Sequence, residues 1–183
     1  MNWRACRTSR QSEDIQCWFS SEPAYDGRVI REATKDDVWA VRLLYSYVQE
    51  HHAAGLPHLF KKPKPNADPG WSITEYLRHR GAFIALYFDE EEAVGYVAAR
   101  RVDRREDTVR FAQSMLYIDQ IGVAPAFRRR AYGRALVDYV KERAALAGKV
   151  TVALDVWNFN DRAHAFFQSC GFTTYREQMW IEP

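Results

Sequence analysis

The stretch that most constrains the fold is residues 117–139, which read YIDQIGVAPAFRRRAYGRALVDY. Its first part is rich in β-branched and aromatic residues and predicts a strand, which Pro125 ends because proline has no N–H to donate to a sheet. Its last part carries apolar residues at helical spacing and predicts a helix over residues 134–147. A strand that leads through a tight turn into a helix presents free N–H groups at the positive end of the helix dipole. The stretch therefore predicts an anion site.

Three consecutive arginines, Arg128, Arg129 and Arg130, occupy the turn and strengthen that interpretation, because charged donors make strong hydrogen bonds to anions. Two alternatives stay open. An arginine run can be a solvated surface, and R-x-x-A-x-G is short enough to occur by chance. The chain has neither G-x-x-x-x-G-K-[ST] nor G-x-G-x-x-G, so the turn is neither a P-loop nor a dinucleotide-binding loop.

The turn resembles the acyl-CoA-binding segment of the GNAT superfamily of N-acetyltransferases. That segment has V-x-P, a short gap, then [RQ]-x-x-[GA]-x-[GA] and a helix; the matching residues are Val123, Pro125, Arg128, Ala131 and Gly133. Residues 160–172, NDRAHAFFQSCGF, resemble a second family pattern, N-x-x-A-x-x-[FL]-[YF]-x-x-x-G-F. The resemblance covers roughly residues 28–181. Two departures are alanine at Ala131, where glycine is frequent, and Phe167, where many members carry a tyrosine that protonates the departing thiolate.

The order of predicted elements agrees with an α+β fold, an α/β/α sandwich, which is also the acyl-CoA N-acyltransferase fold that the resemblance implies. We expect a mixed, mostly antiparallel central sheet of about six or seven strands flanked by helices. Strands are predicted at residues 28–33, 82–88, 93–100, 108–123, 149–156 and 172–181, and helices at 34–51, 72–80, 134–147 and 160–170. We expect one domain over residues 28–183, preceded by an arm of residues 1–27 that has no periodicity.

The resemblance implies that acetyl-CoA is the co-substrate and assigns residues to it. Its pantetheine arm would pair with backbone groups of Ile121, Gly122 and Val123. Its pyrophosphate would lie on the turn and the helix start, at Arg128, Arg129, Arg130, Ala131, Tyr132, Gly133 and Arg134, with one or two of the arginines facing solvent. Asn160 would hydrogen-bond the pantetheine or cap a helix, and Phe167 would pack against the cofactor arm or the core. Gly122 marks either a bulge that frees an N–H for the thioester carbonyl or a close packing contact.

Acetylation of an amine requires that its ammonium, with a pKa of roughly 10, lose a proton. Asp119 is the first candidate for the base, since it is expected on the same strand face as Val123, where many family members place a carboxylate. Tyr117, two residues earlier, is the second candidate. Asp119 could instead be a charge at a strand edge or the partner of an arginine. Because Phe167 has no hydroxyl, Tyr132, Tyr175 or water could replace the tyrosine that protonates the thiolate in many family members.

Composition limits the other possibilities. A chain of 183 residues can form one domain with a substantial core. Its net charge is only +2, with 26 basic and 24 acidic residues, so we expect no nucleic-acid partner. The three cysteines lie in no metal-ligand spacing and favour a reducing compartment. With no long apolar run, a cytoplasmic protein without a membrane partner is the expectation. His51, His52 and His58 lack H-E-x-x-H spacing, so no metal is predicted.

The leading hypothesis is therefore an N-acetyltransferase that transfers the acetyl group of acetyl-CoA to a primary amine of a small molecule or peptide, by direct attack in a ternary complex. The alternative is a non-catalytic acyl-CoA-binding module of the same fold, which Phe167 motivates. Nucleic-acid binding through the arginine run and the basic residues 61–64 is a weaker third hypothesis. The proline-rich segment 55–71 is either a wall of the acceptor site or a plain connection. A homodimer is compatible with the resemblance, because dimers are common among relatives.

Overall fold

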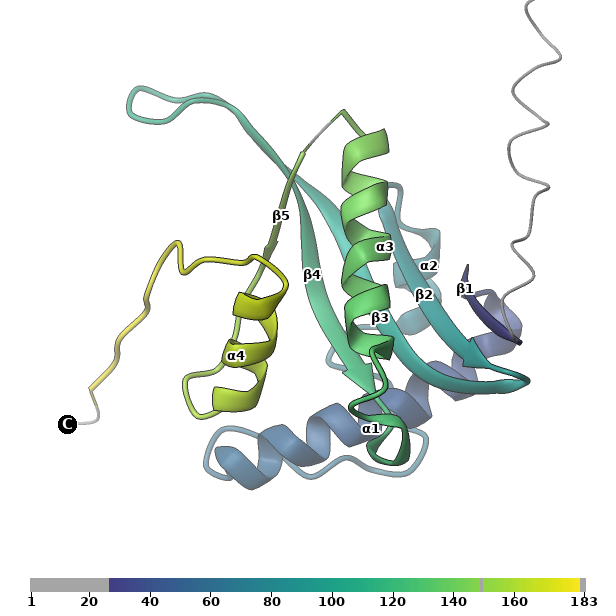
Figure 1. Ribbon diagram of the computed structural model, residues 1–183. Helices are drawn as coiled ribbons and strands as arrows, with labels where there is room; N and C mark the ends of the chain where they lie inside the picture. Colours follow the sequence, from purple (N-terminus) through teal and green to yellow (C-terminus); the bar gives the residue numbers. More distant parts are fainter. Residues whose placement is uncertain (1–26, 149, 182–183) are drawn as a thin grey trace, which may run out of the picture.

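The computed structural model describes residues 27–148 and 150–181, which form a twisted sheet with helices on both faces (Figure 1). The described part contains five strands in one sheet, whose order follows the chain. They are β1 (Arg28–Glu32), β2 (Ala82–Asp89), β3 (Glu92–Arg104), β4 (Gln113–Val123) and β5 (Thr151–Leu154). β1 to β4 are antiparallel neighbours, whereas β5 lies parallel to β4. The sheet is thus mixed and mostly antiparallel, as predicted.

The helices divide between the two faces of the sheet and make it the middle layer of a sandwich. They are α1 (Val38–Gly55), α2 (Ile73–Arg78), α3 (Tyr132–Leu146) and α4 (Asp161–Ser169), with short 3-10 helices η1 (Lys35–Asp37) and η2 (Pro125–Phe127). One core cluster joins α1 and α2 to Ile84, Tyr96 and Ala98 of the sheet. The second core cluster joins α3 to Val97 and Ile118 on the opposite face. In Figure 1, α3 lies in front of the sheet, and α1 and α2 lie behind it.

Local sequence signals explain where several helices begin. Thr34 precedes η1 as its N-cap, and its hydroxyl accepts a hydrogen bond from the backbone N–H of Asp36. Ser72 caps α2 by accepting from the N–H of Glu75 at 3.3 Å. Such side chains replace the missing acceptors of the first helical turn. The predicted helix starts at residues 34 and 72 are therefore confirmed to within a few residues.

The prediction of six or seven strands is wrong for the described residues, since residues 172–181 form no strand. They leave the end of α4 in an extended course away from the sheet (Figure 1), with Tyr175, Met179 and Ile181 more than four-fifths exposed. Strand propensity expresses how well a side chain fits a paired, half-buried surface, so it cannot create a strand where no neighbour pairs. The predicted arm at residues 1–27 lies outside the described residues except for Gly27.

The long hairpin between β3 and β4 also differs from prediction. The strand expected from residue 108 begins at Gln113, and β3 extends to Arg104 instead of ending at residue 100. Between them, the carboxylate of Asp107 accepts hydrogen bonds from the N–H groups of Val109 and Arg110 at 2.8 and 2.9 Å. This side-chain turn competes with strand pairing. The hairpin tip projects beyond the rest of the sheet (Figure 1).

Asp37 anchors the entrance to α1 on β1. Its two carboxylate oxygens each accept a hydrogen bond of 2.8 Å from the guanidinium of Arg31, and one also accepts from the backbone N–H of Thr34. The bonds from Arg31 hold the pKa of Asp37 well below its usual value; burial opposes them, and the bonds from Thr34 reinforce them. The folded protein therefore binds the proton at this site more weakly than the unfolded chain does.

We predict that Asp37→Asn lowers the free energy of unfolding by about 2 kcal/mol at neutral pH, because it removes a charge-assisted pair from a largely buried site. The depressed pKa makes this contribution complete above the unfolded-state pKa of about 3.9, and lost as the pH falls through the folded-state pKa. Urea unfolding between about pH 7 and pH 3 should show a constant difference between the two proteins down to about pH 4, and a difference that begins to shrink below that pH. Asp36→Asn, at the exposed neighbour, is the control, and a difference that does not shrink below pH 4 would contradict the assignment.

Candidate active site

The turn between β4 and α3 exposes a row of backbone N–H groups. Arg129 and Ala131 have left-handed backbones, with φ of 67° and 66°, and Ala131 is the N-cap residue of α3. No described residue accepts a hydrogen bond from the N–H groups of residues 129–134. Successive N–H groups around left-handed residues form a concave anion-binding nest, and the helix dipole adds positive charge there. The left-handed backbone, which costs a non-glycine residue about 1–2 kcal/mol, also gives a reason for the frequent glycine at the position of Ala131.

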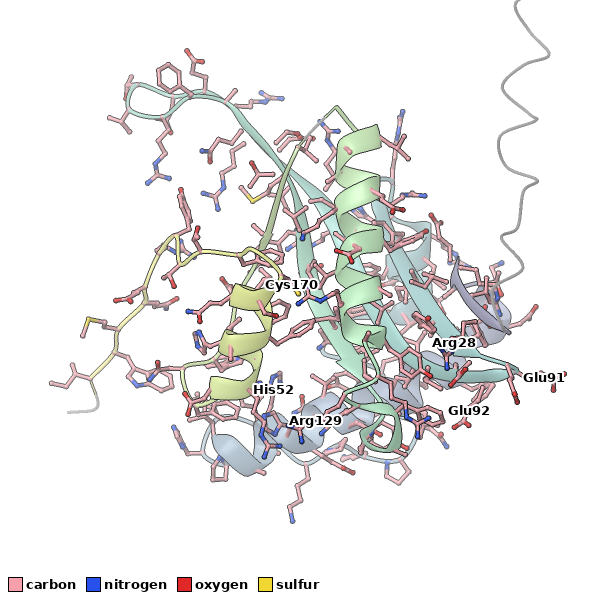
Figure 2. All side chains as sticks on the ribbon, in the orientation of Figure 1. Arg28, His52, Glu91, Glu92, Arg129 and Cys170 are labelled. Atoms are coloured by element: carbon pink, nitrogen blue, oxygen red, sulfur yellow. The ribbon has the colours of Figure 1, made fainter. Side chains whose placement is uncertain are left out.

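The four arginines at positions 128, 129, 130 and 134 make different contacts. The Nε of Arg128 donates to the carbonyl oxygen of Val123 at 3.1 Å. The guanidinium of Arg130 lies over the ring of Phe127, with its Cζ 5.4 Å from the ring centroid. Arg134 donates to the hydroxyl and the carbonyl oxygen of Ser169 and so ties α3 to α4. Arg129 is exposed at the turn beneath α3 and makes no hydrogen bond or ion pair with any described residue (Figure 2). Arg129 and Arg130 are therefore the side chains best placed to add charge at the nest.

Tyr132 fixes the start of α3 through its side chain. It is 2% exposed, its ring lies 4.8 Å from that of Tyr87, and its hydroxyl donates a hydrogen bond to Asp89 at the end of β2. That hydrogen bond and the neighbouring guanidinium of Arg28 lower the pKa of Asp89, although partial desolvation opposes them. Only the backbone N–H of Tyr132 is therefore left to face a ligand, and its phenol is already engaged elsewhere.

The edge of β4 that faces β5 is paired along only part of its length. The ladder joins Met115–Ile118 to Thr151–Leu154 and then ends. Beyond it, Ile121, Gly122 and Val123 pair with β3 on one side only. An open strand edge offers N–H and C=O groups to an extended ligand in the manner of an added strand. This free edge leads directly to the turn before α3.

A β-bulge lies where the β4–β5 ladder ends. Ala98 pairs with Gln120 but Ala99 pairs with Ile118, so Asp119 is the extra residue. Gly122 pairs in regular register with Tyr96, so the bulge, one of the two alternatives for this glycine, is wrong.

An extra residue inverts the alternation of side chains beyond it. Asp119 and Gln120 therefore both face the α1–α2 side, where Asp119 bonds Tyr76 and Gln120 bonds Tyr96. Val123 instead packs into the cluster under α3. The expectation that Asp119 and Val123 share a face is therefore also wrong. Tyr117 and Asp119, which both precede the inversion, do share one.

Gly122 has a packing role. A Cβ atom at this position would lie 2.6 Å from Cγ2 of Val48 in α1 and 3.2 Å from the ring of Tyr96. The absence of a side chain thus lets α1 approach the backbone of β4 next to the bulge. Of the two alternatives left open by the sequence, the close contact is the one present.

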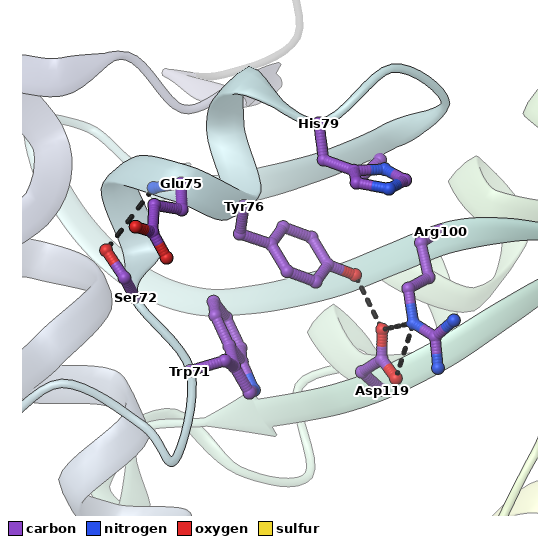
Figure 3. A pocket seen from close by; sticks show the side chains of 8 residues that line it. Trp71, Ser72, Glu75, Tyr76, His79, Arg100 and Asp119 are labelled. Carbon is purple, nitrogen blue, oxygen red and sulfur yellow. Dashed lines mark hydrogen bonds and ion pairs between the residues drawn. The ribbon is translucent and has the colours of Figure 1, made fainter.

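Asp119 lies in an open pocket of about 360 Å³ between α2 and the sheet (Figure 3). The pocket is lined by Trp71, Ser72, Glu75, Tyr76, His79, Ala82, Arg100 and Asp119. The Tyr76 hydroxyl donates to Asp119 at 2.7 Å, and the Nε of Arg100 donates to its two oxygens at 3.2 and 3.0 Å. Burial raises the pKa of Tyr76, and the hydrogen bond to Asp119 raises it further, so this phenol stays protonated and donates. A carboxylate can accept about four hydrogen bonds, and Asp119 retains capacity for one more.

Tyr117 is a hydrogen-bond donor at the same face. Burial raises its pKa, and a hydrogen bond to the carboxylate of Asp155, just after β5, raises it further. The guanidinium of Arg100 lies 5.7 Å from its ring centroid. The phenol is protonated at neutral pH and can donate a hydrogen bond, while its raised pKa makes it a weaker acid than an ordinary tyrosine.

The second motif forms α4 and packs it against α3. Asn160 is the N-cap, and its Oδ1 accepts from the N–H of Ala163 at 3.1 Å, so the capping alternative is confirmed. Phe167 is 8% exposed and belongs to a cluster with Val137 of α3 and Cys170, which faces α3 at the end of α4 (Figure 2). Phe167 thus packs in the core between these helices.

The irregular segment after α1 supplies part of the pocket wall through Trp71. The sequence did not identify Tyr76 or Arg100 as site residues. Their only signal was a short capped helix and a charge at the end of an apolar strand, and neither indicates a pocket. Within the described residues, no group of three or more His, Cys, Asp or Glu side chains could hold a metal ion.

The chain belongs to the GNAT family of acetyltransferases, because that family's sequence model matches residues 44–172. A curated N-acetyltransferase encoded in the pepI 3′ region of Lactobacillus delbrueckii subsp. lactis, itself uncharacterized, is 26% identical over 101 residues. That match covers 55% of this chain and spans 57% of the length of the relative. The recognition made from the two motifs is therefore confirmed.

Solved structures show the same fold. A tetramutant of the BH1408 protein from Bacillus halodurans superposes with a TM-score of 0.80 and 24% identity, covering 85% of this chain and 99% of that one. The aminoglycoside N-acetyltransferase AAC(6′)-Iy, solved in complex with CoA, gives a TM-score of 0.64 with 18% identity, and covers 85% of this chain and 94% of its own. None of the helices in the described part of the chain has the length and apolar character needed to cross a membrane.

We predict that Gly122→Ala destabilises the protein by about 1–3 kcal/mol, because the new methyl group overpacks the contact between β4 and α1. Val48 cannot turn away easily, since β-branched side chains are stiff in helices. The double variant with Val48→Ala should lose less stability than the sum of the two single variants, which denaturant unfolding can measure. Gly70→Ala, at a position with open space around it, is the control. Strict additivity would contradict the proposed contact.

Proposed function

We propose that the protein transfers the acetyl group of acetyl-CoA to a primary amine of a small molecule or peptide, by direct attack in a ternary complex. The observation that carries this proposal is the continuity of two features: the open edge of β4 runs from the bulge at Asp119 to the unpaired N–H groups of residues 129–134. The open strand edge matches an extended arm that carries amides, and the unpaired N–H groups match an anion. Family membership supports the same reaction.

The cofactor site follows from this arrangement. The pyrophosphate would bind the N–H groups of residues 129–134, with charge added by Arg129 and Arg130. The pantetheine amides would pair with the backbone of residues 121–123. The side-chain amide of Asn160 would donate to the arm, since only its oxygen is engaged as a helix cap. Phe167 would hold α4 in place rather than touch the reacting atoms.

The acceptor would enter from the α1–α2 side, where the pocket reaches the bulge. The amine nitrogen forms a C–N bond to the acetyl carbon, the C–S bond breaks, and CoA leaves as a thiolate that takes up a proton. Asp119 has capacity to hold the ammonium and to take its proton, directly or through water. A bulged residue leaves backbone groups unpaired, so an N–H at the bulge, rather than at Gly122, would polarise the thioester carbonyl.

Tyr117 would donate a hydrogen bond to the departing thiolate, the role left open by the absence of a hydroxyl at Phe167. Burial raises the pKa of Tyr117 above that of an ordinary tyrosine, so its phenol would stabilise the thiolate while keeping its proton. A CoA thiolate has a pKa of about 8.5 by analogy with cysteine, so it can leave without an acid and take the proton that the ammonium releases.

A non-catalytic acyl-CoA-binding module is the second candidate. Two observations favour it: Asp119 already accepts hydrogen bonds from Arg100 and Tyr76, and Phe167 has no hydroxyl. Binding of acetyl-CoA without transfer to any amine would identify this function.

We predict that acetyl-CoA binds in calorimetric titration with micromolar affinity, and that changing Arg129 and Arg130 together to alanine weakens binding about tenfold or more, because charge-assisted bonds to phosphate are lost. Arg110→Ala, on the distant hairpin, is the matched control and should bind like the wild type. A folded wild-type protein that does not bind acetyl-CoA would overturn the proposed function.

Asp119→Asn should lower kcat/KM about 10²- to 10⁴-fold near neutral pH, the usual contribution of a general base. The loss should shrink as the pH approaches the pKa of the substrate ammonium, since more of the substrate then arrives as the free amine. Asp103→Asn interrupts a comparable pair with Arg101 on β3 and serves as the control. Undiminished turnover of Asp119→Asn at every pH would remove Asp119 from the chemistry.

A further inference from the structure

The pocket beside the bulge carries opposite charges at its two ends. Glu75 of α2 lies at one end, while Arg100 of β3 lies at the other, with His79 nearby and Tyr76 between them (Figure 3). The rings of Trp71 and Tyr76 lie 4.4 Å apart and form an aromatic wall. A pocket of this kind suits a ligand with both charges and an apolar part.

Arg100 has donors left for a ligand. Only its Nε is used by Asp119, at 3.0 and 3.2 Å, and its terminal nitrogens make no hydrogen bond with any described residue. The side chain is 44% exposed, so a ligand can reach it. A guanidinium with two free terminal nitrogens matches the planar geometry of a carboxylate.

The negative groups are equally well placed for an ammonium. Asp119 has capacity for one more hydrogen bond next to Arg100, and the carboxylate of Glu75 makes no hydrogen bond with the described residues. In an α-amino acid the ammonium and the carboxylate are attached to one carbon atom. Asp119 and Arg100, which touch each other, could therefore contact both groups of such a molecule at once.

We propose that the acceptor is an α-amino acid, with its carboxylate on the terminal nitrogens of Arg100, its amine at Asp119 and an apolar side chain against Trp71 and Tyr76. This inference rests on the proposed function and names its substrate class. A polyamine would bring a second positive charge close to the guanidinium, where like charges repel. The reaction on an amino acid is the transfer written above, giving an N-acetylamino acid, CoA thiol and a proton.

The test compares L-phenylalanine with L-phenylalaninamide, which lacks the carboxylate. Wild-type protein should acetylate the acid in preference to the amide. Arg100→Gln should lower kcat/KM for the acid about 10- to 100-fold more than for the amide, the loss expected for charge-assisted hydrogen bonds. The amine pKa of each substrate is the same in both enzymes, so it cancels in this ratio. Arg80→Gln, an exposed neighbour outside the pocket, is the control. Equal losses for acid and amide would mean that Arg100 only positions Asp119, and would overturn the inference.

Calorimetric titration of the acetyl-CoA-free protein with the same two compounds separates this inference from the proposed function. Binding of the acid, not the amide, without any acetyl transfer would support the pocket's specificity and overturn the enzymatic function. Acetylation of the amide as efficiently as the acid would retain the enzymatic function and overturn the amino-acid inference. Absence of transfer, with neither compound bound or with both bound equally, would overturn both.

Discussion

The extra residue at Asp119 is the constraint on which the arrangement of the site depends. One inserted residue turns the side chains of Asp119 and Gln120 to the same face of the sheet. The pairing of β4 with β5 ends at the preceding residue. The bulge therefore coincides with three transitions: from paired to open edge, from one side-chain alternation to the other, and from core to pocket. Gly122 then allows α1 to close over the backbone just beyond it.

The start of α3 is fixed by contacts that leave its N–H groups free. Tyr132 bonds Asp89, Arg128 bonds Val123, and Arg134 bonds Ser169. Each of these bonds uses a side chain and none uses the backbone N–H groups of the turn. A site whose donors are held in place before the ligand arrives loses little entropy on binding. The small residues of the turn, Ala131 and Gly133, therefore matter for backbone shape, while Arg128 and Arg134 support the turn from outside.

Much of the fold could be predicted from residues that act locally. Thr34, Ser72 and Asn160 cap helices at the expected places, and Pro125 follows the end of β4. The two motifs identified the family. The closing strand at residues 172–181 could not be judged in the same way, because a strand exists only with a partner. Glycine is the usual sequence signal of a bulge, which made Gly122 one possible position, whereas the bulge lies at Asp119, a carboxylate that gives no such signal.

The sequence by itself determined the order of the elements, the helix caps and the turn that presents N–H groups, because each depends on residues a few positions apart. Only the tertiary structure decided which side chains meet. Tyr76 and Arg100 lie 43 and 19 residues from Asp119 along the chain, and their contact depends on strand register and on where α2 crosses the sheet. Register is set by the whole set of packed neighbours, and a shift of one residue reverses every side chain beyond it. The chemistry of the pocket is therefore a property of the folded chain.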